Sequence, residues 1–258
     1  MPQYAPPTRQ HLTIITGASR GMGLAMAQQL VQPGARLLCI SRRRNPDLQA
    51  LADAAGAVLE QWSADLADGA PAAQQLKGWL AALDTQALDS ATLINNAGLI
   101  SPLVALRDSD PLALAQALRV GVEAPLQLCA AFLDATRDWA VPRKVLNISS
   151  GLGRRAMASS AAYCAAKAGM DHFTRCLALE EAAVPNGAKV CSLAPGVIAT
   201  DMQLQLRSAD PAHFPDLPTF QGLHAGGQLS SPQDAARRVL EYLNSASFGH
   251  EAVGDVRR

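Results

Sequence analysis

A tyrosine and a lysine stand four residues apart in the stretch "YCAAK", Tyr163 to Lys167, among residues that are otherwise small. In a helix, positions i and i+4 lie on one face, one turn apart, so the phenol and the ammonium would be neighbours. A free tyrosine has a pKa of about 10, which suits proton transfer near neutral pH poorly. A nearby ammonium stabilises the phenolate and lowers that pKa, so the pair could exchange protons with a bound molecule. The alternative is a surface tyrosine above a lysine on an alanine-rich helix.

A glycine-rich turn follows the first apolar run of the chain. The run "HLTIIT" at 11–16 has strand character, and "TGASRGMG" continues from it into a stretch with helical spacing. Glycine permits a tight turn and close approach of backbone to phosphate, and the N-terminus of the next helix attracts a pyrophosphate. The sequence therefore predicts a dinucleotide site, with a plain glycine-rich loop as the alternative. The expected contacts are Gly17, Ser19, Arg20, Gly21, Met22 and Gly23.

The second strand, at 35–41, ends in "SRRR" and carries no acidic residue at its tip. A carboxylate at this point holds the ribose diol of NAD, whereas an arginine accommodates the additional phosphate of NADP. Ser41, Arg42 and the Arg20 of the glycine turn therefore favour NADP. A solvated basic turn is the alternative for the two arginines that follow. Asp65 and Leu66, after the third strand, are expected to face the adenine.

Short apolar runs alternate with longer helical patterns along the chain. Strands are expected at 11–16, 35–41, 56–62, 91–96, 143–149 and 188–194, and helices near 21–32, 71–83, 110–137, 160–183 and 232–244. Near-continuous apolar strands separated by helices indicate a parallel sheet covered on both faces, a Rossmann-type doubly wound α/β fold. Such a sheet binds its ligand beyond the C-terminal ends of its strands. A single domain is expected over 11–258, after a flexible tail at 1–10.

Composition narrows the classes of function. The 22 basic residues balance 22 acidic ones, which argues against a general nucleic-acid binder. The five cysteines are scattered and form no C-x-x-C pair, so neither a disulfide framework nor a metal site is expected. The first residues lack the apolar core of a signal peptide, and no apolar run reaches the roughly 18 residues of a membrane span. A reducing cytoplasm fits this profile, without a membrane partner.

Five motifs together resemble the short-chain dehydrogenases/reductases over about residues 11–256. They are "TGASRGMG", "NNAG" at 95–98, "NISS" at 147–150, "YCAAK" and "PGVIATDM" at 195–202. Ser150 stands 13 residues before Tyr163, which is the usual separation of the catalytic serine and tyrosine in that family. A narrower likeness, in "TDMQLQLRSADPAHFPDLPTF" and the closing "GDVR", is to the benzil and sepiapterin reductase-like branch. Members of that branch reduce small dicarbonyl compounds.

The resemblance implies a role for each part of the site. Tyr163 would donate a proton, Lys167 would also hold the nicotinamide ribose, and Ser150 would hydrogen-bond the substrate carbonyl as charge develops on it. The further cofactor contacts that it implies are Asn96, Ala97, Gly98, Pro195, Gly196, Ile198 and Thr200. Family members usually form homodimers or homotetramers through the helices after strands four and five.

The chain departs from the family pattern at Gly121. Members usually carry an asparagine in a V-N-x-x-x-P pattern, thought to anchor a water that relays protons to the lysine, but this chain reads "RVGVEAP". We expect the glycine to leave room for such a water. On this hypothesis Gly121→Asn preserves or raises the rate, and the helix gains stability because glycine is lost.

A long segment at about 198–231 is rich in proline, glycine and apolar residues, and loops of this length are often lids. Its side chains indicate an apolar or aromatic substrate, or else they only pack the loop down. Asn147 is expected to be structural. Arg154 and Arg155 could meet an anionic substrate, with a solvent-facing pair as the alternative.

These features predict an NADPH-dependent enzyme that reduces a small ketone, dicarbonyl or aldehyde by hydride transfer, with Tyr163 as the proton donor. A second interpretation is an alcohol dehydrogenase or reductase acting on a sugar or an acyl-carrier intermediate. A third is a non-catalytic NADP-binding regulator, because Gly121 replaces the relay asparagine.

Overall fold

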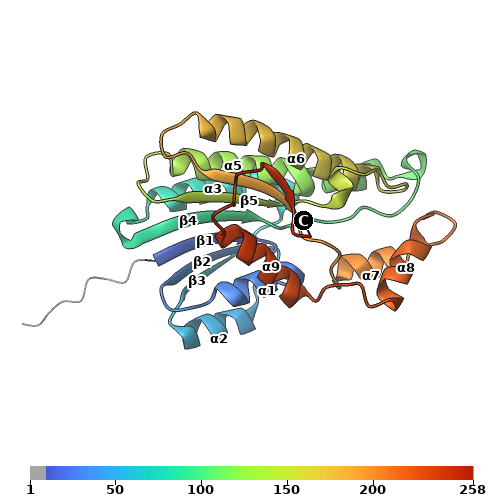
Figure 1. Ribbon diagram of the computed structural model, residues 1–258, viewed down its shortest axis with the longest axis horizontal. Helices are drawn as coiled ribbons and strands as arrows, with labels where there is room; N and C mark the ends of the chain where they lie inside the picture. The colour runs from blue at the N-terminus through green and yellow to red at the C-terminus, as the bar shows by residue number, and fades with distance from the viewer. Residues whose placement is uncertain (1–9, 258) are drawn as a thin grey trace, which may run out of the picture.

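The computed structural model describes residues 10–257, which are built around a parallel β-sheet (Figure 1). The strands are β1 (Gln10–Thr16), β2 (Ala35–Ser41), β3 (Val58–Ser63), β4 (Leu88–Asn95), β5 (Arg143–Ile148), β6 (Lys189–Ala194) and β7 (Val253–Asp255). In this part of the chain their order is β3-β2-β1-β4-β5-β6-β7, with every neighbouring pair parallel. The direction of winding reverses between β1 and β4, so the C-terminal ends of these strands mark the expected ligand site. Apart from Gln10, which begins β1, the predicted tail at 1–10 lies outside the described residues.

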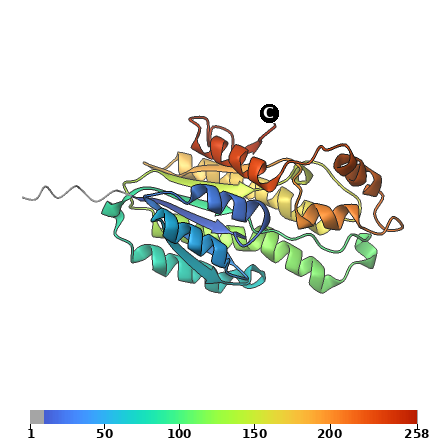
Figure 2. The same ribbon diagram turned by 90° about the horizontal axis from the view of Figure 1, so that it is seen from below.

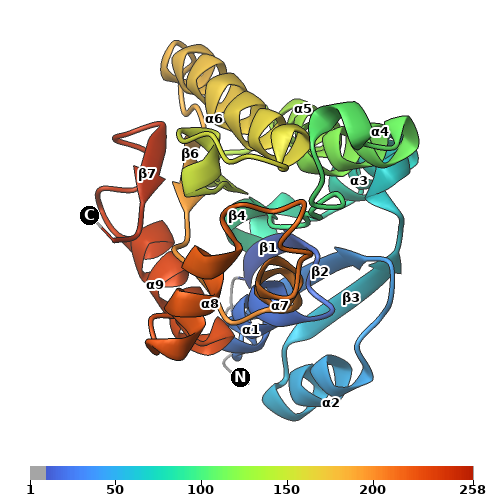
Figure 3. The same cartoon turned by 90° about the vertical axis from the view of Figure 1, so that its right-hand side faces the viewer.

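Alternate side chains of the central strands enter two separate cores, one on each face of the sheet. Ile14 packs with Leu38 in the first core, and Ile15 packs with Cys39 in the second. The first core lies under α3 (Gly69–Ala81), α5 (Ala124–Ala135) and α6 (Ala161–Ala182), and the second under α1 (Gly21–Leu30), α2 (Pro46–Ala55) and α9 (Pro232–Asn244). Figure 3 shows these two layers on opposite sides of the strands. The predicted doubly wound fold is confirmed.

The helix expected at 110–137 is broken in its middle. It consists of α4 (Pro111–Leu118), a π-helical turn at Arg119–Glu123 and α5. Pro125 has no N–H to donate to the carbonyl four residues earlier, so the α-helical pattern cannot continue through this point. The Ala124 N–H instead bonds the Arg119 carbonyl, five residues back. A proline at the second position of a helical segment is the signal that could have revealed the break.

Other elements were not predicted from the sequence. α2 begins after Asn45, whose side chain accepts from the Leu48 N–H at 3.0 Å, with Pro46 at the first helical position. An N-cap residue followed by proline is a recognised start signal, and it could have been found in "NPDL". β7 is only three residues long and pairs with β6, too short for a periodic pattern to reveal.

The segment expected to be a lid is mostly helical. It contains α7 (Asp201–Arg207) and α8 (Leu217–Ala225), which lie together beyond one end of the sheet (Figures 1 and 2). Its two ends meet at its base, where Ala199 N–H donates to the Ser230 carbonyl at 2.9 Å and Ser230 N–H to the Val197 carbonyl at 3.0 Å. The segment therefore leaves the body of the sheet and returns to it at neighbouring residues. Among residues 10–257, no helix has both the length and the apolar character needed to cross a membrane.

Candidate active site

The glycine turn after β1 presents bare backbone at the start of α1. Gly17 and Gly21 have φ of 69° and 56°, a region that suits glycine. A Cβ on Gly23 would lie 2.2 Å from the Gly17 carbonyl oxygen, so no other residue fits there. No side chain caps α1, which leaves its first amide donors to an anion.

The "NNAG" motif at the end of β4 forms hydrogen bonds with this turn. The Thr16 hydroxyl accepts from the N–H groups of Asn96 and Ala97, both at 3.0 Å. Asn96 Nδ2 donates to the carbonyls of Thr16 at 3.0 Å and Gly17 at 3.3 Å. Asn96 and Ala97 therefore hold the glycine turn in shape.

The arginine run after β2 is tied in place by a pair of amides that the sequence analysis missed. Asn45 N–H donates to Gln61 Oε1 at 2.8 Å, and Gln61 Nε2 donates back to the Asn45 carbonyl at 3.0 Å. Asn45 Nδ2 also donates to the Ser19 carbonyl of the glycine turn at 3.2 Å. The exposed Arg42 is thus carried on a loop fixed to both β3 and the glycine turn.

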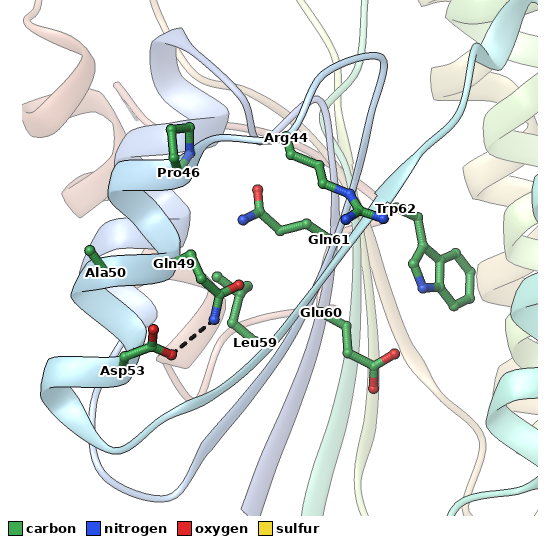
Figure 4. Close-up of a pocket in the computed structure, with 9 residues that line it drawn as sticks. All are labelled: Arg44, Pro46, Gln49, Ala50, Asp53, Leu59, Glu60, Gln61 and Trp62. Atoms are coloured by element: carbon green, nitrogen blue, oxygen red, sulfur yellow. Dashed lines mark hydrogen bonds between the residues drawn. The ribbon is translucent and has the colours of Figure 1, made fainter.

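Arg20, an expected phosphate ligand, and Arg44, expected to lie in a solvated turn, both have other neighbours. The Arg20 guanidinium forms an ion pair with Asp201 at the start of α7, although both side chains remain mostly exposed. An exposed pair of this kind is worth little and yields easily to a stronger partner. Arg44 reaches over β3 toward Trp62, along the hollow between α2 and β3 (Figure 4). Ser41, in contrast, is buried at the end of β2, and its hydroxyl has no hydrogen-bond partner among the described residues.

Asp65 and Leu66 follow β3 as expected, but their side chains have structural contacts. The Asp65 carboxylate accepts from the Ala67 N–H at 3.0 Å and caps a short 3-10 turn. Leu66 is only 5% exposed and packs into the core beneath α3 and α5.

Tyr163 and Lys167 lie one turn apart on α6, as their spacing predicts. The Lys167 ammonium is 5.8 Å from the centre of the Tyr163 ring and donates to the Ile148 carbonyl at 2.7 Å. Both side chains are buried. Ser150 begins the 3-10 turn after β5, and its hydroxyl accepts from the Leu152 N–H at 3.2 Å. The same hydroxyl lies close enough to the Tyr163 phenol to lower the pKa of that group. The three residues therefore meet at the C-terminal edge of the sheet.

Further contacts join the separate motifs at this edge. A Cβ on Gly98 would lie 3.8 Å from the Lys167 ammonium, and a Cβ on Gly21 would lie 3.6 Å from a methyl group of Thr200. Gly196 has a φ of 87° and turns the chain from β6 toward Ile198. The glycine turn, "NNAG", α6 and the segment after Pro195 thus surround one place.

Burial dominates the electrostatics of the pair on α6. It lowers the pKa of Lys167 to about 8, although the negative charge of Asp171 acts in the opposite direction. Burial also raises the pKa of Tyr163, against the hydrogen bond from Ser150, which lowers it. The expectation of a lowered tyrosine pKa is therefore wrong for the chain without cofactor, because desolvation of the phenolate outweighs the favourable contacts.

Comparison with known proteins assigns this arrangement to a family. The model of the short chain dehydrogenases matches residues 11–211. The chain belongs to the short-chain dehydrogenase family. Benzil reductase ((S)-benzoin forming) of Bacillus cereus is 34% identical over 235 residues, which cover 91% of this chain and 94% of that protein. Sepiapterin reductase of Xenopus tropicalis is 32% identical over 256 residues, covering 92% of each chain. The expected likeness to the benzil and sepiapterin reductase branch is confirmed.

Solved structures agree over nearly the whole chain. A short-chain dehydrogenase/reductase from Burkholderia vietnamiensis is 33% identical with a TM-score of 0.65, covering 97% of this chain and 99% of that one. A structure from Agrobacterium tumefaciens with bound NADP is 26% identical with a TM-score of 0.77, covering 98% and 97%. The chain is similar to both throughout its sheet and its helices.

Gly121 does not leave the space expected in this short-chain dehydrogenase. The residue is buried in the π-helical turn, and a Cβ placed on it would lie 2.8 Å from the Cβ of Ala166. That methyl group is fixed to the backbone of α6, next to Lys167. An asparagine would push the two helices apart, so the expectation that Gly121→Asn stabilises the helix is wrong. The glycine is required by close packing against α6.

Asn147 lies inside a buried polar network, in keeping with its expected structural role. It accepts from Asn95 Nδ2 at 2.9 Å and donates to the Thr174 hydroxyl at 2.9 Å. Arg154 and Arg155 are both exposed, in keeping with the solvent-facing alternative. The Arg154 guanidinium also contacts the buried carboxylate of Asp171 at 3.0 Å.

The segment 198–231, which is expected to be a lid, packs directly onto Tyr163. Tyr163 belongs to an apolar cluster with Leu206, Phe214, Leu217 and Phe220 of the segment 198–231, and with Ile100, Leu103 and Met157. The rings of Phe214 and Phe220 are stacked with their centres 5.6 Å apart. Ser159, at a φ of 60°, donates to the His213 carbonyl at 2.5 Å and ties the lid to the residues before α6. The apolar side chains of this segment therefore pack against one another and against Tyr163.

Proposed function

We propose that this protein uses NADPH to reduce a small ketone, dicarbonyl or aldehyde to the alcohol. The observation that carries the proposal is the meeting of Ser150, Tyr163 and Lys167 beneath an apolar lid, beside an uncapped glycine turn. The glycine turn fits a pyrophosphate, and the unpartnered hydroxyl of Ser41 fits a polar group of an adenosine. The family to which the chain belongs supports redox chemistry at this place.

The residues of the chain have distinct tasks in this reaction. Bound NADPH supplies the hydride for the carbonyl carbon. Ser150 donates a hydrogen bond to the carbonyl oxygen and stabilises the negative charge that grows there. The Tyr163 phenol then transfers its proton to that oxygen, which completes the alcohol. The ammonium of Lys167 stabilises the phenolate that remains, until a proton from solvent restores the phenol.

The basic residues around the second strand support NADPH rather than NADH. No carboxylate stands at the tip of β2, and Arg42 is exposed on a loop fixed beside the glycine turn. Arg20 is near enough to serve once it leaves Asp201. A 2′-phosphate carries about two negative charges and binds such guanidinium groups through paired hydrogen bonds.

The lid supports an apolar or aromatic substrate. Phe214 and Phe220 are stacked within the cluster that contains Tyr163, so a substrate that enters must replace apolar contacts with contacts of its own. The similarity to benzil reductase and sepiapterin reductase favours a small dicarbonyl compound.

A panel of carbonyl compounds tests this proposal. The purified chain is given NADPH with benzil, sepiapterin, an aldehyde, a sugar ketone or an acyl-carrier thioester, and the loss of NADPH absorbance is followed. We expect turnover with the aromatic or dicarbonyl compounds, and Tyr163→Phe should lower it by about 10²- to 10⁴-fold while NADPH still binds. Turnover with only the sugar or the thioester would support the second interpretation. Tight NADPH binding without any turnover would support a regulator.

We further propose that the protein is a homodimer or homotetramer in the cytoplasm. Exposed leucines on the outer helices support an interface, since Leu112 on α4 is 79% exposed and Leu179 on α6 is 76% exposed. The five free cysteines support a reducing compartment. Sedimentation at several protein concentrations would give the number of subunits.

A further inference from the structure

Arg154 occupies the end of the short turn that Ser150 begins. The turn at Gly151–Gly153 has Ser150 as its first flanking residue and Arg154 as its last. Arg154 Nε donates to the Asp171 carboxylate at 3.0 Å, and Asp171 lies on α6 one turn after Lys167. The loop that carries the serine is thus fastened to the helix that carries the tyrosine and the lysine.

The carboxylate at the centre of this contact is almost completely buried. Asp171 is 1% exposed, and its second oxygen accepts from the Ser192 hydroxyl of β6 at 2.7 Å. Arg154 also donates through Nη2 to the Gly254 carbonyl of β7 at 2.9 Å. The buried charge is therefore paired and hydrogen-bonded, and the guanidinium spans α6 and β7 at once.

The backbone of the same turn lies tightly on α6. A Cβ on Gly153 would be 2.9 Å from the Lys167 carbonyl oxygen and 2.9 Å from an oxygen of Asp171. No side chain fits between the turn and the helix, so the turn has little freedom to slide. Only the short run 151–153 separates this contact from the serine.

We propose that Arg154 and Asp171 are positioning residues, which hold the Ser150 hydroxyl at its working place beside the Tyr163 phenol. The inference rests on the proposed function of Ser150 and Tyr163. A serine on a turn moves with that turn, and a displacement of about 1 Å in a catalytic group can cost about 10²-fold in rate. The guanidinium fixes the far end of the turn, and the Ser150 hydroxyl accepts from the Leu152 N–H at the near end.

The chain offers a matched control at the opposite end of the same two elements. Arg143 begins β5 and is 3% exposed, and its guanidinium lies 4.0 Å from Glu181 near the end of α6. It also donates to the Asn186 carbonyl at 2.6 Å. Arg143 therefore joins β5 to α6 as Arg154 joins the β5 turn to α6, but far from Ser150. A purely structural role would give the two arginines equal effects.

A double-mutant cycle tests the proposal in the complete chain with NADPH and its best carbonyl substrate. Arg154→Met should lower kcat by about 10- to 100-fold and leave NADPH affinity unchanged. In the Ser150→Ala background the same change should alter kcat by less than about two-fold, because no hydroxyl remains to be positioned. Arg143→Met should lower the melting temperature but change kcat by less than about two-fold.

Arg154→Lys keeps the test decisive if Arg154→Met does not fold. A lysine can neutralise Asp171 but cannot hydrogen-bond Asp171 and Gly254 together through a planar fork. Arg154→Lys should therefore lower kcat less than Arg154→Met does, and it too should have little effect in the Ser150→Ala background. Equal losses in both backgrounds, or an equal loss with Arg143→Met, would overturn the inference while leaving the proposed function in place. Normal turnover by Ser150→Ala would instead remove the role of Ser150 and overturn both.

Discussion

At the scale of single residues, the burial of Lys167 imposes an electrostatic cost on the folded chain. Its pKa is lowered from 10.5 to about 8, so below pH 8 the folded chain carries a charge that burial disfavours. Between these two values the unfolded chain binds more protons than the folded chain, and stability rises with pH. The burial of the ammonium therefore does not stabilise the fold, and under the proposed function its position serves the reaction.

Lys167→Met should therefore stabilise the folded chain while it abolishes reduction. We expect the free energy of unfolding at pH 7 to rise by up to about 3 kcal/mol, reduced by the lost hydrogen bond to the Ile148 carbonyl. The difference from the unmodified chain should shrink as the pH rises from 8 toward 10.5. Urea unfolding across this range measures it, and a difference that does not depend on pH would contradict the argument.

The arginine run after β2 allows a second test with a built-in control. Arg42→Asp should weaken NADPH binding and spare or improve NADH binding, because it places a carboxylate where an additional phosphate would lie. Arg44→Asp removes the same charge from a side chain that reaches toward Trp62 (Figure 4), so it should change the preference much less. Titration of both cofactors gives the ratio, with each tenfold change equal to about 1.4 kcal/mol. Equal effects of the two substitutions would mean that only net charge matters.

At the scale of elements, the contact between the π-helical turn and α6 sets how closely two helices approach. Gly121→Ala should gain up to about 1 kcal/mol of helix propensity but lose about 1–3 kcal/mol to overpacking against Ala166. We expect a net loss of stability and of kcat, since Ala166 precedes Lys167. Adding Ala166→Gly returns the missing space and should restore most of both. Thermal unfolding and turnover of the unmodified chain and of the two variants test this prediction. Stabilisation by Gly121→Ala alone would show that α6 can move to accept the added methyl group.

The elements also show how far the sequence can lead. Tyr163 and Lys167 could be paired because helical spacing is a local property, and the glycine turn because it directly follows a strand. The contact of Arg20 with Asp201 joins residues 181 positions apart, and no local pattern reveals it. The helices α7 and α8 were missed because the prolines and glycines of the segment around them resemble a loop, while tertiary packing around Phe214 favours the helices.

At the scale of the whole molecule, the lid is a separate unit set on a complete sheet. Its apolar cluster is distinct from the two cores of the sheet, and its ends already meet at Ala199 and Ser230. Replacing residues 201–229 with a short glycine–serine linker should leave the sheet folded and NADPH bound. Reduction should be lost, because Tyr163 would stand open to water.

Circular dichroism, NADPH titration and turnover together check the lidless chain. The phenol should also titrate at a lower pH than in the complete chain, since burial is what raises its pKa. An unfolded product would show that the lid belongs to the folding unit of the sheet. Undiminished turnover would show that it does not cover the substrate.

The hydrogen bond from Arg154 to the Gly254 carbonyl joins two residues that are synthesised at different times. The two residues are 100 positions apart, and β6 and α9 are both made between them. A ribosome therefore synthesises Ser150, Tyr163 and Lys167 before it synthesises β7, which carries the second hydrogen-bond partner of the Arg154 guanidinium. A nascent chain that stops short of Val253 contains the residues of the central strands and of the glycine turn, but it lacks the Gly254 carbonyl that Arg154 contacts. The contact of the serine turn with β7 can therefore form only after this three-residue strand at the edge of the sheet has been made.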